Sequence, residues 1–258
     1  MGNSLFREVV FGPVKSRRLG LSLGINILPA DAKICSFNCI YCECGWNTSG
    51  QGSSFVPRDV VFKEMEERFS IISGTREQID VITFAGNGEP TLHPDFHEII
   101  DDTIRLRDIF LPGIPIAVLS NSTMLSKESV RKALLKCEMP ILKLDSAIPE
   151  TIQIINNIKA GFSFEDYFNG LLMMKNHAAI QTMFLKGNYN GKVFDNTTDK
   201  ELKAWIELLK QIEPEEVQVY TLHRSTPSRE VFPISHEKLK EIALLLKKES
   251  FNVHLVLN

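Results

Sequence analysis

Short apolar runs and amphipathic segments alternate along most of this chain. The apolar runs are rich in Val and Ile and bounded by turn residues, which is typical of buried strands; they span 21–28, 80–86, 114–121, 140–146, 180–187, 216–222 and, at the end, 252–258. Helical patterns separate them, over 56–72, 92–108, 126–137, 199–212 and 234–249. This alternation predicts an α/β fold with a parallel sheet and outer helices.

The side-chain pattern of two predicted strands indicates where an active site could lie. In 140–146 and 180–187, one face is apolar and the other carries polar side chains, namely Lys143, Asp145, Thr182 and Lys186. Because outer helices would cover the apolar face, we expect the polar set to face a lumen. Polar groups near the carboxyl ends of strands are typical of barrel active sites. Asp145 and Lys186 lie nearest those ends, and we predict that they are catalytic and hold the substrate. The alternative is that the two lysines extend outward at the strand ends.

The length and the net charge of the chain limit the kinds of protein that it could be. The 258 residues fit one domain, 1–258, with an N-terminal extension over 1–18 and a C-terminal helix and extra strand over 223–258. The formal net charge of −3 provides no general attraction for nucleic acid or membranes. No apolar run approaches the ~18 residues of a membrane span, and the first residues lack the regions of a signal peptide. We therefore expect a cytoplasmic protein with no membrane partner.

Four of the five cysteines lie within ten residues, in "CSFNCIYCEC", directly after the first predicted strand. A zinc site needs four ligands, usually in two separated pairs, whereas iron–sulfur cubanes are held by thiolates, commonly four. The spacing Cys35-x3-Cys39-x2-Cys42 provides three, and three would leave one iron open for chemistry. Cys44 is either a further functional thiol or a small buried residue. Cys137 lies apart in a helical pattern, as a buried apolar cysteine does.

The next two predicted strands end in polar segments. The second ends in Gly86-Asn87-Gly88-Glu89, and the third in Ser120-Asn121. Glycine lets a ligand approach the backbone closely, a carboxylate accepts hydrogen bonds from an ammonium, and Ser and Asn offer neutral donors and acceptors. Taken singly, these segments could be a turn and a helix cap. Their occurrence at successive strand ends favours a binding site.

These segments together resemble a known family. Cys35–Cys42, with Tyr41 at its aromatic position, resembles the CxxxCxΦC motif of radical S-adenosylmethionine (radical SAM) enzymes, and "GNGEP" resembles their "GGEP" segment. The resemblance implies a partial (β/α)6 TIM-like barrel. It also implies a [4Fe–4S] cluster on Cys35, Cys39 and Cys42, and S-adenosylmethionine on the open iron. The implied contacts to that cofactor come from Tyr41, Gly86, Asn87, Gly88, Glu89, Ser120 and Asn121.

The implied activity is reductive cleavage of S-adenosylmethionine to a 5′-deoxyadenosyl radical. That radical would abstract hydrogen from a small or medium-sized substrate in the lumen. The implied electron donor is a flavodoxin or a ferredoxin-type protein. An iron–sulfur electron carrier is a distant alternative, because it would not need the Gly-Asn-Gly-Glu segment. A zinc-stabilised binding module lacks the necessary ligands.

A longer signature, which includes "FGPVKSRRLGLSLGINILP", resembles small radical SAM proteins described as similar to wyosine synthetases. Those synthetases remodel a methylated guanine in transfer RNA. They carry further cysteines and a basic surface, which this slightly acidic chain lacks, and RNA binding depends on phosphate neutralisation. Transfer RNA modification is therefore the alternative function, and RNA a partner that is not favoured.

Basic residues flank the predicted barrel at two points. Arg17 and Arg18 precede the first predicted strand, and His223 and Arg224 follow the sixth. An arginine there could bind a substrate carboxylate or phosphate in a bidentate manner. The alternative is a surface ion pair.

Overall fold

The computed structural model describes residues 5–47, 54–75, 78–159, 161–224 and 226–257. Its strands are β1 (Val10–Ser16), β2 (Gly20–Ile25), β3 (Val81–Phe84), β4 (Ile116–Ser120), β5 (Met139–Lys143), β6 (Ala179–Tyr189), β7 (Lys192–Asp195), β8 (Glu216–Thr221), β9 (Val231–Pro233) and β10 (Val253–Leu255). Its helices are α1 (Arg58–Ser73), η1 (Pro90–Leu92, a 3-10 turn), α2 (Phe96–Phe110), α3 (Glu128–Leu134), α4 (Pro149–Ile155), α5 (Phe164–Leu172), α6 (Asp199–Ile212) and α7 (His236–Lys248).

The sheet has the order β1-β2-β3-β4-β5-β6-β8-β10. Neighbours from β2 to β10 are parallel, and β1 is antiparallel to β2. The predicted α/β class, with parallel strands inside and helices outside, is therefore confirmed. The last predicted strand is also present, since β10 pairs with β8.

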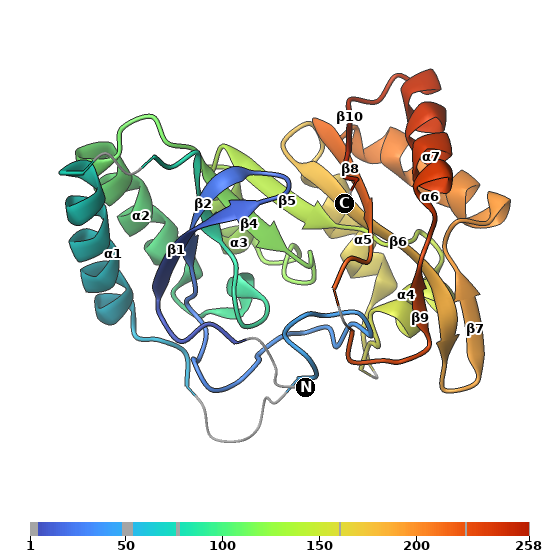
Figure 1. Cartoon of the computed structure of the whole chain (residues 1–258), viewed down its shortest axis with the longest axis horizontal. Coiled ribbons are helices and arrows are strands. Elements are labelled where there is room, and N and C mark those ends of the chain that lie inside the picture. The colour runs from blue at the N-terminus through green and yellow to red at the C-terminus, as the bar shows by residue number, and fades with distance from the viewer. Residues whose placement is uncertain (1–4, 48–53, 76–77, 160, 225, 258) are drawn as a thin grey trace.

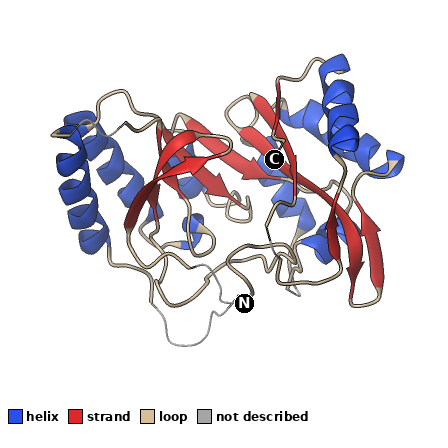
Figure 2. Cartoon of the chain, viewed as in Figure 1, coloured by secondary structure: helices blue, strands red, loops and turns tan. Residues whose placement is uncertain are grey.

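The strands curve around an inner face, and the helices lie outside them (Figure 1, Figure 2). Within the described ranges β1 and β10 do not pair with each other, so the barrel is partial and not closed. None of the described helices has the length and apolarity needed to cross a membrane.

Several elements were not predicted. Residues assigned to an N-terminal extension form β1, which makes a hairpin with β2. Helices α4 and α5 fill the connection between β5 and β6. β6 continues past its parallel neighbours and pairs there with the short strands β7 and β9, both antiparallel to it. The hairpin of β6 and β7 projects away from the barrel (Figure 1).

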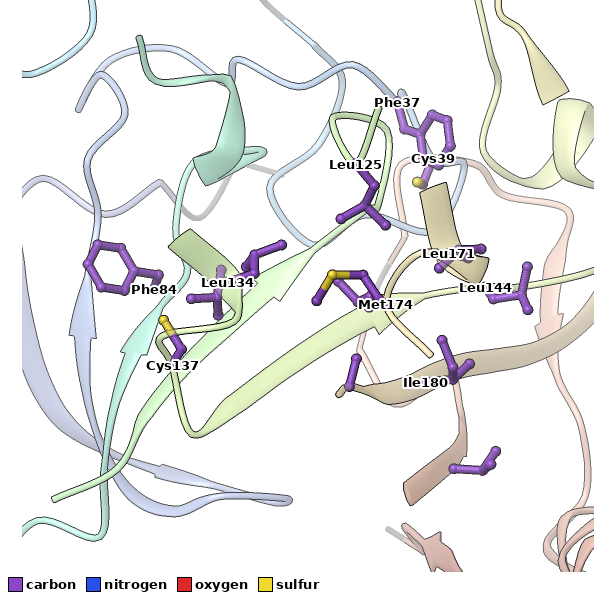
Figure 3. Close-up of a cluster of buried hydrophobic side chains, with 14 of the residues drawn as sticks. Phe37, Cys39, Phe84, Leu125, Leu134, Cys137, Leu144, Leu171, Met174 and Ile180 are labelled. Atoms are coloured by element: carbon purple, nitrogen blue, oxygen red, sulfur yellow. The ribbon is translucent and has the colours of Figure 1, made fainter. Parts of the chain in front are cut away.

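The inner and outer faces of β6 are the reverse of the prediction. Ile180, which shares one face of β6 with Thr182 and Phe184, lies in the core between the sheet and the helices together with Leu144 (Figure 3). The Met183 backbone N–H donates to the Asp145 carboxylate at 3.0 Å. Thr182 is buried and donates to the carbonyl of Leu144 at 2.6 Å, and Phe184 packs edge-on against Trp205 of α6. Thr182 therefore lies on the helix side of β6, and the prediction that it faces the lumen was wrong.

The main apolar core lies between the sheet and the helices. Figure 3 shows part of it, where Leu144, Ile180, Leu171 and Met174 gather, with Phe37 of the cysteine-rich loop (residues 33–47) at one end. Leu142 and Leu144 face this core, as the strand pattern predicted, and both are fully buried. The helix starts follow local chemistry: Ser163, Thr198 and Ser235 each accept a hydrogen bond from the backbone N–H three residues on.

Alanine substitutions of two neighbouring leucines would test the packing of this core. Leu134 is fully buried (0% exposed), whereas Leu135 is 47% exposed. We expect Leu134→Ala to lower the free energy of unfolding by about 2–5 kcal/mol, because it leaves a cavity. Leu135→Ala should change it by about 0.5 kcal/mol or less. Urea denaturation followed by circular dichroism measures both, and equal effects would contradict the packing described here.

Candidate active site at the carboxyl ends of the strands

The cysteine-rich loop, residues 33–47, leaves β2 and crosses the carboxyl ends of the strands (Figure 1). Its start pairs with the segment after β3: Ile34 donates to the carbonyl of Asn87 and accepts from the N–H of Glu89, both at 2.9 Å. Its middle is tied to the end of α4, where the N–H of Asn38 donates to the carbonyl of Asn156 at 2.9 Å. The loop is therefore fixed at both sides of the barrel.

Two glycines make this close pairing feasible. Gly86 and Gly88 have φ of +151° and +138°. A Cβ on Gly88 would collide with the backbone of Ile34, and one on Gly86 would collide with Asn26. The close approach inferred from the sequence is thus present, but in this structure it is made by the cysteine-rich loop.

Side-chain amides donate to two of the three predicted ligand thiols. Asn121 Nδ2 donates to Cys35 Sγ, and Asn156 Nδ2 donates to Cys39 Sγ, each at 3.3 Å. Burial raises the pKa of both thiols; Glu89 raises that of Cys35 further, while Lys143 opposes the increase at Cys39. Such amide donors would stabilise a thiolate in an otherwise dry loop.

Cys42 has a different environment. A hydrogen bond from the Cys44 thiol and the nearby Lys33 ammonium lower its pKa below the ordinary value for cysteine. Lys33 is 1% exposed and donates to the carbonyl of Gly45 at 2.7 Å. Burial alone would lower the pKa of Lys33, but Cys42, Cys35 and Cys39 outweigh it and raise that pKa. The loop therefore contains a buried cation beside its thiols.

Cys44 is partly buried and contacts two of the predicted site residues, Cys42 and Gly86. Its Sγ lies 3.4 Å from the carbonyl oxygen of Gly86 and also contacts Cys42. Cys137 is buried near the end of α3, where its thiol donates to the carbonyl of Ala133. Of the two cysteines outside the CxxxCxxC spacing, only Cys44 therefore lies at this site.

The loop's donor set fits an iron–sulfur cluster. Thiolates are the ligands that such clusters use, and hydrogen bonds to sulfur help to set their potentials. Among the described residues, no three His, Cys, Asp or Glu side chains are grouped as ligands of a single metal ion. In a cubane each thiolate binds a different iron, so the thiols need not converge on one point.

Glu89 is the centre of the second part of the site. Its side chain accepts from Ser120 Oγ at 2.9 Å, from the Asn121 N–H at 2.6 Å and from Thr91 Oγ1 at 2.5 Å. Glu89 is 2% exposed, and this burial raises the pKa of its carboxyl group, although the hydrogen bonds oppose the increase. The structure thus brings Glu89, Ser120 and Asn121 together, beside Cys35.

Asn87 differs from its neighbours. It is fully buried, and its side chain binds the N-terminal segment: Nδ2 donates to the carbonyls of Phe6 and Pro29 at 2.8 and 2.7 Å. Its Oδ1 accepts from the N–H of Phe6. The predicted Asn87 side chain is therefore engaged by the protein itself.

Asp145 forms the third part of the site, together with Tyr41. The Asp145 carboxylate accepts from Tyr41 Oη at 2.5 Å and from Asn156 Nδ2 at 2.9 Å, and its side chain is 0% exposed. Burial and the Asp145 charge raise the pKa of Tyr41 well above its ordinary value. Tyr41 is thus a neutral phenol that donates to Asp145.

Lys143 is the cationic partner of Asp145, with Nζ 3.3 Å from Oδ1. It lies over the rings of Tyr41 and Tyr220, at 5.0 and 5.9 Å from their centroids. Burial lowers the pKa of Lys143, but the Asp145 carboxylate outweighs this and raises it overall. Lys186, in contrast, is exposed where β6 pairs with β7 and β9, so the structure does not bring it to Asp145.

Three residues at the site were missed by the sequence reading. Asn156 touches both Cys39 and Asp145, Lys33 lies beside the thiols, and Tyr220 accepts from Lys143 Nζ at 3.4 Å. A lysine two positions before the first cysteine was a visible signal for Lys33. Asn156 follows a helix that the pattern did not predict, so the sequence contained no signal for its position.

Comparison with known proteins agrees with this geometry. The model of the Radical SAM superfamily matches residues 32–209, which include all three parts of the site. The chain belongs to the radical SAM superfamily. It is thus related to enzymes whose cofactor is S-adenosylmethionine, as the cysteine motif implied.

Relatives and solved structures extend this result. A UPF0026 protein of Synechocystis sp. is 34% identical over 224 residues, which cover 84% of this chain and 77% of that protein. GTPase Obg of Brachyspira hyodysenteriae is 32% identical over 238 residues; the match covers 90% of this chain but spans only 32% of that protein. The structure of TYW1 with a lysine-pyruvate adduct has a TM-score of 0.62 at 17% identity, covering 92% of this chain and 76% of that one. This structural likeness concerns the fold.

Two glycines in different environments, Gly88 and Gly113, allow a test of the contact between the cysteine-rich loop and the segment after β3. Gly88→Ala should lower the free energy of unfolding by roughly 3 kcal/mol or more, because backbone strain and the collision with Ile34 add. Gly113→Ala is the control: φ is +84° there, but no atom lies within 4 Å of the new Cβ. It should cost about 1–2 kcal/mol. Thermal and urea unfolding measure both, and equal losses would disprove the close contact.

Proposed function

We propose that this protein reductively cleaves S-adenosylmethionine at a [4Fe–4S] cluster held by Cys35, Cys39 and Cys42. The product radical would abstract hydrogen from a substrate in the lumen. The observation that carries this proposal is the position of Asn121: its side chain donates to Cys35 Sγ, and its backbone N–H donates to Glu89. One residue therefore connects a cluster ligand with the buried carboxylate at the next strand end.

When bound, the cluster and S-adenosylmethionine would supply the electron and the 5′-deoxyadenosyl radical. The protein's part is to bind, orient and exclude water. Glu89 would accept from the cofactor's ammonium together with the carbonyls of Gly86 and Gly88, and Ser120 and Asn121 would contact the ribose. Tyr41 would back the adenine. Because its own hydrogen bonds fix the Glu89 carboxylate, it would not need to reorganise on binding.

Asp145 is the residue we assign to holding the substrate or a proton in the lumen. Its side chain lies among three hydrogen-bond donors and one cation, so its orientation is fixed. Lys143, which is paired to it, takes the role for which the sequence favoured Lys186. The external reductant that we propose is a flavodoxin or a ferredoxin-type protein.

Modification of transfer RNA is the second candidate. The fold-level likeness to TYW1 favours it and agrees with the resemblance to wyosine synthetase-like proteins. The formal net charge of −3 speaks against a large phosphate-binding surface. We therefore place it below a reaction on a smaller substrate.

The cluster assignment predicts the metal content. Anaerobically reconstituted protein should contain about four iron and four sulfide per chain, as a cubane requires. Replacing Cys35, Cys39 or Cys42 by Ala should abolish most of this content. Cys137→Ala, in the core, is the matched control and should retain it, and Cys44→Ala should retain it as well. Stoichiometric zinc without sulfide would refute the assignment.

The cofactor assignment predicts the effect of Glu89→Ala. We expect it to weaken S-adenosylmethionine binding by ~2–5 kcal/mol, because a desolvated ammonium loses its carboxylate. Equilibrium dialysis under anaerobic conditions measures this, with iron content as the check that the site is intact. Glu98→Ala, at a half-buried position of α2 away from the site, is the control and should bind normally. Unchanged affinity for Glu89→Ala at full iron content would remove Glu89 from the site.

A further inference from the structure

A cavity of about 600 Å³ lies between the β1–β2 hairpin and the inner face of the sheet. One end is lined by the turn of the hairpin and the other by the loop after β8. Its walls include Phe6, Phe11, Lys15, Arg17, Arg18, Ser22, Thr83, Ala85, Glu43, His223 and Arg224. Ala85 directly precedes Gly86, so the cavity borders the proposed cofactor position. Its lining, however, does not include Glu89, Ser120 or Asn121.

The cavity has an excess of positive charge at the hairpin turn. Arg224 is neutralised, because its Nη1 lies 2.6 Å from the carboxylate of Glu43. In the described part of the chain, Arg18 forms no ion pair with a carboxylate; its guanidinium lies over the ring of Tyr220, 4.8 Å from the centroid. Arg18 is half-buried, and Lys15 and Arg17 flank it. A half-buried guanidinium without a carboxylate is a suitable anion ligand.

Another part of the lining is aromatic. The ring of Phe11 lies against Gly24, where a Cβ would collide with it, and Phe6 stacks on Phe11 with centroids 3.9 Å apart and planes at 20°. The lining also includes Ser22 and Thr83, whose hydroxyls form a hydrogen bond of 2.7 Å. The cavity therefore combines cationic, polar and aromatic groups.

We propose that this cavity binds a small anionic substrate, with its phosphate or carboxylate at Arg18 and Arg17 and its planar or apolar part against Phe11 and Phe6. This inference rests on the proposed function, since it names the substrate class of the same lumen. Tyr220 connects the two regions: its ring lies under Arg18, and its hydroxyl accepts from Lys143. A substrate anchored at Arg18 thus extends toward the cofactor end without displacing the Lys143–Asp145 pair.

The test is equilibrium binding of simple probes to cluster-loaded protein, without reductant or S-adenosylmethionine. Isothermal titration calorimetry compares phenyl phosphate, benzoate and neutral phenol. We expect at least one anion to bind at least tenfold more tightly than phenol, and salt to weaken that binding. The tighter anion identifies phosphate or carboxylate as the substrate group. Binding of phenol as tight as that of both anions overturns the proposal.

Charge-removing variants locate the anion. Arg18→Gln should weaken binding of the tighter anion at least tenfold, and Arg17→Gln, at an exposed position, should weaken it several-fold. Lys203→Gln is the control, because it removes the same charge from an exposed site on α6. Circular dichroism melting confirms that each variant is folded. Equal losses in all three variants would show nonspecific attraction and overturn the proposal.

Competition separates this site from the cofactor site. Saturating S-adenosylmethionine should leave the anion's dissociation constant unchanged within about threefold; full displacement would mean that the arginines belong to the cofactor site and would overturn the proposal. Cofactor cleavage is measured separately, as 5′-deoxyadenosine formed after reduction. Anion binding without cleavage would count against the proposed function alone, and cleavage without anion binding against the substrate class alone.

Discussion

The contact between two backbone segments underlies the whole site. The cysteine-rich loop pairs at Ile34 with Asn87 and Glu89, and it can do so only because Gly88 has no side chain. This pairing places the thiols at the same edge of the sheet as Glu89. A looser contact would let the cysteine-rich loop and the Glu89 segment move independently, and precise chemistry at the proposed site requires them to be fixed together.

Buried charge is the second constraint, and the structure balances it locally. Lys143 faces Asp145, Lys33 faces the thiols, and Glu89 faces neutral donors. Burying ions costs several kcal/mol each unless partners compensate. A protein does not need such groups for folding, since apolar residues would fill the same space with less penalty. Buried ionisable groups with perturbed pKa values cluster at functional sites, so their concentration at the strand ends indicates an active site.

Much of the architecture followed from strand–helix alternation, since parallel neighbours and outer helices need little more than the hydrophobic pattern. The approach of Cys35, Glu89 and Asn121 was predictable for the same reason: parallel strands end at one edge. The faces of β6 were not, because Thr182, Met183 and Phe184 are all compatible with burial on a doubly covered sheet. Only the register beside Asp145 decides between the faces, and register is a tertiary property.

Asn156 has a consequence for how variants of this protein must be understood. Its one amide nitrogen donates to Cys39 Sγ and to Asp145 at the same time. Without the Asp145 carboxylate, the Asn156 nitrogen would have Cys39 Sγ as its main acceptor. Its hydrogen bond to that sulfur would then become stronger. A change of Asp145 would therefore alter the electronic environment of Cys39, which we propose as a cluster ligand. Under the proposed function, turnover and redox behaviour are then physically coupled through a single planar group.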